Sequence, residues 1–147
     1  MCTEDEAHRY GRFLCTTLDL VMRWRSSKEI FMAECGNYPG FVSVLRKAQD
    51  DNTQESQLSF DNYRFVVHKW NTRIARAAVS CLESGSYTQI RNALIVLTRI
   101  LPHFPRTTNI CGAIERRVNK LREEEKEKRP DLKVCLSEID KVVPLRP

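Results

Sequence analysis

The sequence is poor in glycine and proline, with five and six of these residues among 147. So few turn-forming residues argue against a turn-dense β fold and, together with 41% hydrophobic residues, against disorder. The sequence shows neither a signal peptide nor an apolar run of membrane length. We therefore expect a soluble, intracellular, all-α protein without a membrane partner, and a single domain over residues 1–147.

The motifs of common catalytic sites are also missing. The chain contains no GxSxG nucleophile elbow, no GxxxxGK phosphate loop and no GxGxxG dinucleotide loop. Its histidines, His8, His68 and His103, fall in different segments, and none has a metal-ligand partner at helical spacing. We expect a non-enzymatic protein with no catalytic residue, metal, cofactor or small-molecule substrate; an enzyme would need a cleft assembled from distant residues.

The six cysteines, at positions 2, 15, 35, 81, 111 and 135, form no CxxC pair and no local zinc knuckle. Four of them lie in apolar helical patterns, which favours small buried thiols in a reducing compartment. A disulfide framework or a metal site assembled from distant cysteines is the alternative.

Basic residues outnumber acidic ones, 24 to 19, giving a formal net charge of +5 and a pI of about 9.0. This balance permits contact with phosphate or with an acidic protein surface. Charges of both signs are interleaved along the chain, however, which is more typical of solvated helix surfaces.

The first third of the chain has the periodicity of two helices. Residues 3–25 begin with capping-box spacing at Thr3 and Glu6. The apolar stripe predicted for this helix comprises Tyr10, Leu14, Thr17, Val21 and Trp24. Ser27 would cap a shorter helix over 28–35, and Gly36 would end it in a left-handed conformation. One or two further helical turns are expected around 41–45, followed by a polar loop over about 48–58.

Four more helices are predicted downstream. Ser59 would cap a helix that ends before Gly85, with the stripe Tyr63, Val67, Trp70, Ile74, Ala77 and Cys81. Residues 86–101 would return antiparallel to it as a largely buried helix, and a further helix would begin at Thr108 and continue into a charged end over about 122–129. Pro130 would open the last helix. The predicted architecture is an irregular stack of antiparallel helices, α-solenoid or HEAT-like, without an exact repeat.

Two groups of basic residues are candidates for a partner or RNA surface. With about 100° per residue, Lys69, Arg73 and Arg76 share one face of their predicted helix. The second group consists of Arg116, Arg117, Lys120 and Arg122. Each group could form salt bridges within the fold, contact a protein or bind RNA. Exposed aromatic residues for base stacking are not expected, because Tyr63, Trp70 and Tyr87 fall in the apolar stripes.

The segment 34–41, ECGNYPGF, joins two helical patterns through an aromatic turn. Pro39 disfavours a helical conformation at Tyr38 and directs the chain into the next segment. Tyr38 and Phe41 are therefore either anchors in the core or an exposed docking knob.

Several of these segments together resemble the THO complex subunit 2 family. The resemblance is carried by residues 35–41 (CGNYPGF), 66–70 (VVHKW), 93–102 (ALIVLTRILP) and 123–132 (EEEKEKRPDL), with 12–15 (RFLC) and 21–24 (VMRW) before them. It runs from about residue 10 to residue 132, and the polar loop and the last helix fit it less well.

The resemblance implies an internal segment of a larger helical scaffold in a nuclear complex that couples transcription to mRNA packaging and export (THO/TREX). The expected partners are other THO complex subunits, a DEAD-box RNA helicase of the export pathway, and mRNA or mRNP directly or indirectly. The alternative is a direct RNA-binding module that uses the two basic groups.

Overall fold

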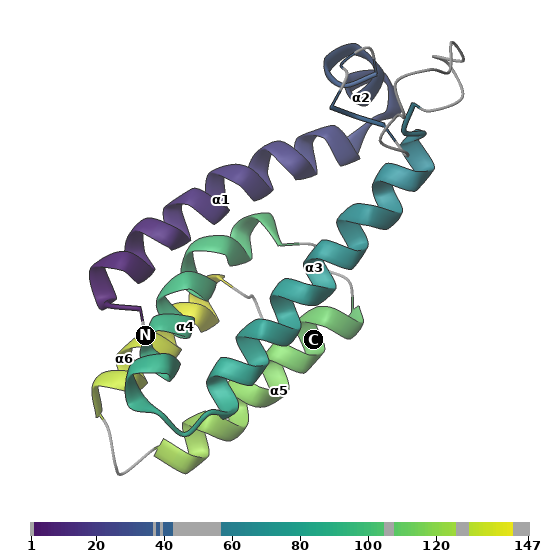
Figure 1. The fold of residues 1–147 in the computed structure, drawn as a ribbon. Helices are drawn as coiled ribbons and strands as arrows, with labels where there is room; N and C mark the ends of the chain where they lie inside the picture. The colour runs from purple at the N-terminus through teal and green to yellow at the C-terminus, as the bar shows by residue number, and fades with distance from the viewer. Residues whose placement is uncertain are drawn as a thin grey trace. The chain divides into compact units, whose positions relative to one another are not determined.

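A computed structural model describes residues 2–36, 38, 40–42, 57–104, 108–125 and 130–142. Within these ranges the chain forms six α-helices, α1 (Glu4–Ser26), α2 (Lys28–Glu34), α3 (Phe60–Glu83), α4 (Tyr87–Ile100), α5 (Thr108–Glu125) and α6 (Pro130–Val142), with a short 3-10 helix, η1 (Leu101–His103), after α4 (Figure 1). The described residues contain no sheet, and Val42 and Gln57 form an isolated antiparallel bridge. The predicted all-α class is confirmed.

The chain divides into two compact units. The first, which we call the core unit, comprises residues 1–18 and 71–147, and the second, the corner unit, comprises residues 19–70. Because α1 and α3 are long, each contributes its residues to both units.

The start of α1 shows how its sequence directs the helix. The backbone amide of Thr3 donates to Glu6 Oε2 at 2.7 Å, and the Glu6 amide donates to Thr3 Oγ1 at 3.3 Å, which confirms the predicted capping box. These bonds hold the pKa of Glu6 below its usual value. Leu14 and Val21 of the predicted apolar stripe pack inward, but the stripe as a whole was rotated, because the other inward residues are Ala7, Gly11 and Leu18. Tyr10 and Phe13 are 56% and 64% exposed.

An aromatic cluster forms the centre of the corner unit. Phe31, which is fully buried, stacks on Tyr63 with ring centroids 4.8 Å apart and meets Phe41 edge-on at 6.0 Å. The Tyr63 hydroxyl donates to the Val21 carbonyl at 3.0 Å. Ser27 caps α2, as predicted, by accepting a hydrogen bond from the Glu29 amide at 3.2 Å.

The turn after α2 corrects one prediction about Gly36. Among the described glycines, Gly85 has a positive φ, and Gly36 does not. Gly36 is instead required by close packing, because a Cβ there would lie 2.7 Å from the Met32 carbonyl oxygen. Its amide is bonded to the carbonyls of Phe31 and Met32, so the chain leaves α2 along a tight path that has no space for a side chain.

The core unit is organised around α4. Figure 1 shows α4 running back beside the C-terminal half of α3, in the antiparallel hairpin that the sequence predicts. Gly85, with φ of 70°, makes the sharp turn between them. α6 packs against both α4 and α5 and begins at Pro130, as predicted. The Tyr87 hydroxyl of α4 donates to the Asp131 carboxylate of α6, which lowers the pKa of Asp131 and raises that of Tyr87.

The buried face of α3 also differs from the predicted one. Its buried residues recur almost every fourth position and comprise Tyr63, Val67, Asn71, Ala75 and Leu82. Trp70 was placed in the stripe by its apolar character but is 46% exposed, and Ala77 and Cys81 are exposed as well. Asn71 takes the inward position instead, with an amide that has no hydrogen-bond partner among the described residues.

Some predictions fall on segments outside the described residues. These are the helical turns after Phe41, most of the polar loop at 48–58, the corner at Pro105 and the last part of the charged segment at 122–129.

Candidate interaction surfaces

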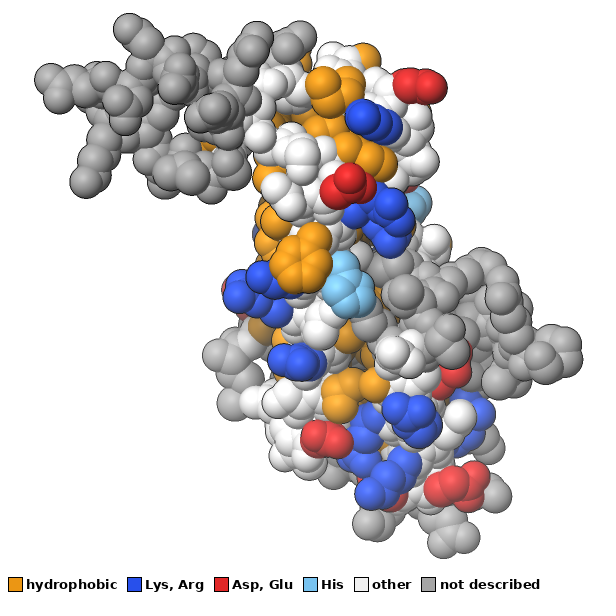
Figure 2. Space-filling model, turned by 90° about the vertical axis from the view of Figure 1, so that its right-hand side faces the viewer, with side chains coloured by type: hydrophobic (Ala, Val, Ile, Leu, Met, Phe, Trp, Pro, Cys, Tyr) orange, Lys and Arg blue, Asp and Glu red, His pale blue; other side chains and the backbone are white. Residues whose placement is uncertain are grey.

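Lys69, Arg73 and Arg76 form the first candidate surface, the α3 cation row. All three are exposed, and no carboxylate side chain occurs in α3 between Asp61 and Glu83. Figure 2 views the side on which α3 and α5 lie in Figure 1 and shows groups of Lys and Arg side chains with hydrophobic side chains between them. Within the described part of the chain, Arg73 and Arg76 have no ion-pair partner. The α3 cation row therefore remains a candidate surface for an external anion.

Aromatic side chains accompany the α3 cation row, contrary to our expectation. Phe65 is 58% exposed, and the Lys69 ammonium lies 4.6 Å from its ring centroid in a cation–π contact. Trp70 is the other exposed aromatic residue near the row. Trp70 was predicted to be buried because it is apolar and falls at helical spacing in the stripe, whereas Phe65 lies outside the predicted stripe and was not considered.

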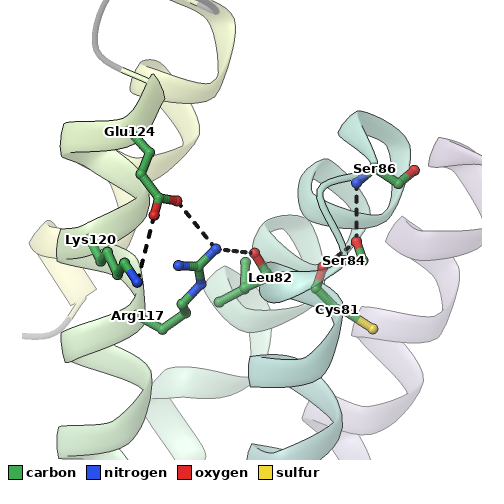
Figure 3. A network of polar contacts seen from close by, with 7 residues as sticks. All are labelled: Cys81, Leu82, Ser84, Ser86, Arg117, Lys120 and Glu124. Carbon is green, nitrogen blue, oxygen red and sulfur yellow. Dashed lines mark hydrogen bonds and ion pairs between the residues drawn. The ribbon is translucent and has the colours of Figure 1, made fainter.

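The second basic group, on α5, is largely engaged within the fold. Arg117 is only 13% exposed, and its Nη2 donates to the Leu82 carbonyl at 3.0 Å and lies 3.4 Å from Glu124 (Figure 3). Leu82 lies in the last turn of α3, where carbonyl groups lack helical partners and attract a cation. Ser84 supports the same helix end, since its hydroxyl donates to the Cys81 carbonyl at 2.8 Å. Arg117 thus joins α5 to the α3–α4 corner.

The other members of the α5 group differ in their surroundings. Lys120 is 70% exposed and lies 3.8 Å from Glu124 one turn away, so one carboxylate is shared by two cations. Arg122 is half-buried and also has an interaction partner, whereas Arg116 is exposed. Among the described residues, the α5 group is therefore more fully engaged within the fold than the α3 cation row.

Tyr38 and Phe41, which the sequence could not separate, have different environments. Phe41 is half-buried and meets the rings of Trp24 and Phe31 edge-on, at 5.5 and 6.0 Å between centroids. It acts as an anchor of the corner unit. Tyr38 is 60% exposed and remains a candidate for docking.

The nearby acidic residue Glu34 has a structural role. Its carboxylate accepts a hydrogen bond from Trp24 Nε1 at 2.7 Å and pairs with the Arg23 guanidinium. Glu34 therefore joins the end of α2 to the end of α1, and it orients the Trp24 ring that packs on Phe41.

The cysteines are less uniformly buried than predicted. Cys35 is fully buried, and burial raises the pKa of its thiol. Cys15 and Cys135 are half-buried, whereas Cys2 and Cys81 are exposed. No group of three potential metal ligands occurs among the described residues. Nor does any described helix have the length and apolar character needed to cross a membrane.

Comparison with known proteins identifies the family. A family model described as "Transcription factor/nuclear export subunit protein 2", Tho2, matches residues 1–142. The chain belongs to the Tho2 family. The match extends beyond residue 132, so it includes both the polar loop and the last helix, the two segments that fit the resemblance less well.

Individual relatives agree with the Tho2 assignment. THO complex subunit 2 from Mus musculus is 56% identical over 132 residues, and the Homo sapiens protein is 55% identical over the same length. These matches cover 89% of this chain and 8% of each relative. The Arabidopsis thaliana protein is 41% identical over 138 residues, which are 94% of this chain and 7% of that relative. The chain thus spans about a twelfth of the curated relatives' length.

Neither the description of the Tho2 family nor the names of these relatives is that of an enzyme. The resemblance found in the sequence motifs is confirmed at the level of the family. No solved structure matches this chain.

Proposed function

We propose that this chain is a non-catalytic helical scaffold segment of a THO complex, which couples transcription to mRNA packaging and nuclear export. Its partners are other THO complex subunits and a DEAD-box RNA helicase of the export pathway. The observation that carries the proposal is the identity of 55–56% to proteins named THO complex subunit 2 over 89% of this chain. Such a segment acts in the nucleus by presenting rigid surfaces to its partners.

The distribution of exposed apolar residues supports an assembly role. Tyr10 and Phe13 lie side by side on α1, with ring centroids 6.5 Å apart and more than half of each residue exposed. Tyr38 and Phe65 are similarly exposed on other segments. Large apolar side chains that cluster on a surface mark protein interaction sites, and aromatic residues are enriched among those that contribute most to binding.

Direct RNA binding is a second candidate function, and the α3 cation row favours it. Exposed cations without carboxylate partners bind phosphates, and exposed aromatic rings stack on unpaired bases. Lys69, Arg73 and Phe65 supply both features on one continuous helix. The α5 group adds little to this candidate, because Arg117 and Lys120 share Glu124.

One binding experiment tests both candidates. The purified chain is titrated with the export DEAD-box helicase and, in parallel, with single-stranded RNA at about 50 and 200 mM salt, a range over which phosphate-driven binding weakens steeply. The matched variants are Phe13→Ser, which reduces exposed apolar surface, and Arg73→Glu with Arg76→Glu, which removes phosphate contacts.

Saturable helicase binding that changes little with salt supports the scaffold proposal. RNA binding alone, lost at the higher salt and in the Arg73→Glu, Arg76→Glu variant, overturns it in favour of the second candidate. Binding of neither partner counts against both candidates.

A further inference from the structure

The core unit contains an apolar groove of about 440 Å³. One wall is formed by α1 through Tyr10 and Leu14, the other by α3 through Ile74, Ala77 and Cys81, and α4 forms the floor. Figure 1 shows α4 between α1 and the C-terminal half of α3. The groove lies wholly within residues of the core unit.

The dimensions of the groove match a helix. Its floor extends along α4 from Gln89 to Ile100, which at 1.5 Å per residue is about 16 Å, or three helical turns. Ala77, Ala78 and Ala93 line it with small side chains, so another helix can approach closely. The amide of Asn92 at the floor already donates to the Cys2 carbonyl at 2.6 Å, which leaves few polar groups for a polar ligand.

The two edges of the groove differ in chemistry. On α3, Arg73 precedes the lining residue Ala77 by one turn and is exposed, with Arg76 further along the exposed surface. No described carboxylate neutralises these cations. On α1, Phe13 lies beside the lining residue Tyr10 and extends the apolar surface outward. Glu6 lies near that edge but is engaged in the capping box with Thr3.

We propose that this groove binds an amphipathic helix of a partner protein, with apolar residues facing α4 and α1 and carboxylates along the flank that faces Arg73. Helix-in-groove binding uses anchors at positions i, i+3 or i+4, and i+7, which fit a floor of three turns. The edges favour one orientation, because Arg73 lies along the α3 edge whereas Tyr10 and Phe13 form most of the α1 edge. This inference rests on the proposed function, because it takes the partner helix to belong to another protein of a THO complex.

The test uses two fluorescent synthetic peptides as probes. Each is about 18 residues long, since shorter isolated helices are marginally stable, and carries leucines on one face. The first has glutamates along one flank, and the second has lysines at the same positions. Fluorescence anisotropy measures their binding to the full chain. We expect the glutamate peptide to bind saturably and about tenfold more tightly than the lysine peptide, a difference of about 1.4 kcal/mol.

Substitutions in the lining of the groove test whether the peptide binds there. Ala77→Trp and Cys81→Trp add bulk at two exposed lining residues and should each weaken binding about tenfold. Asn119→Trp adds the same bulk at an exposed position of α5, which does not line the groove, and should leave the affinity unchanged. Arg73→Glu should reverse the preference between the two peptides. Circular dichroism confirms that each variant retains its helices.

The inference is overturned if the glutamate peptide does not bind saturably, if it binds no better than the lysine peptide, or if binding survives both tryptophan variants. Co-purification with other THO complex subunits is measured in parallel. A variant that loses the peptide but still co-purifies overturns the role of the groove in assembly and leaves the proposed function standing. Failure of the unmodified chain to co-purify counts against the proposed function, while the peptide result still decides the groove.

Discussion

The corner unit and the core unit are built from different kinds of side chain. In the corner unit, Phe31 and Tyr63 are buried together, with Phe41, Phe60 and Trp24 packed around them. The core unit has an aliphatic interior of leucine, isoleucine and valine, in which Phe104 is the buried aromatic residue among those described. Aromatic rings bring large buried area to a small unit but require defined orientations. A short aromatic segment can therefore stabilise a corner that has few helical turns.

The two units also satisfy their polar groups differently. In the corner unit the polar tips of core rings are bonded, Tyr63 to the Val21 carbonyl and Trp24 to Glu34. In the core unit, Arg117 donates to the Leu82 carbonyl at a helix end, whereas the buried Asn71 amide has no hydrogen-bond partner among the described residues. The corner unit should thus be sensitive to changes in single rings, and the core unit to the loss of one guanidinium.

The largest effect is expected for Phe31→Ala, because Phe31 is fully buried and contacts three neighbouring rings, those of Phe41, Phe60 and Tyr63. Removal of a buried phenyl ring should lower the free energy of unfolding by about 3–5 kcal/mol. Hydrogen exchange should show the greatest loss of protection within residues 19–70. The control, Tyr38→Ala at an exposed ring, should change stability little. Equal losses in both variants would contradict the assignment of Phe31 as the centre of the corner unit.

For the core unit the corresponding change is Arg117→Met, which keeps the apolar stem and removes the guanidinium. A hydrogen bond from a charged donor contributes about 1.5–3 kcal/mol, so urea unfolding should show a loss of about 2 kcal/mol. Arg116→Met, one residue earlier at an exposed position, is the matched control and should stay within about 0.5 kcal/mol of the unmodified chain. If the two variants are equally stable, the bond to Leu82 does not hold the α3–α4 corner.

A smaller effect is expected for Tyr63→Phe, which removes the hydroxyl that donates to Val21. Near neutral pH the loss should be about 1 kcal/mol. Burial raises the pKa of the Tyr63 hydroxyl far above its usual value, with a further contribution from Cys35. The unfolded chain therefore releases this proton first, and the stabilisation is lost as pH rises above about 10. Unfolding from pH 8 to 11 should show a weaker alkaline decline in Tyr63→Phe than in the exposed control Tyr10→Phe.

The sequence predicted the positions of the helices along the chain better than it predicted which face of each helix is buried. Capping residues at Thr3, Ser27 and Ser59 and the turn at Gly85 are local features, so helix boundaries could be placed within a few residues. The inward face of α3 depends on neighbours that are distant in the chain. Trp70 is the more apolar residue, yet Asn71 faces inward, and periodicity alone could not distinguish two adjacent positions.

For the candidate surfaces, the sequence predicted only which types of residue they contain. Lys69, Arg73 and Arg76 were placed together because one helix carries them. Nothing in the local sequence showed that Arg117 would reach a carbonyl group 35 residues earlier, while its neighbour Arg116 stayed exposed. The groove over α4 was equally hidden, since it is lined by three helices that are separated in the chain.

The smallest perturbation is chemical labelling, which compares the reactivity of one cysteine in each unit. Cys35 of the corner unit is fully buried, and burial raises the pKa of its thiol, whereas Cys81 of the core unit is exposed. Because the thiolate is the reactive species, a maleimide at about pH 7 should modify Cys81 rapidly and Cys35 only after unfolding. Peptide mass spectrometry over time measures both rates in the same sample. Fast modification of Cys35 in the folded chain would mean that the corner unit opens readily, and that its aromatic centre is less stable than the aliphatic one.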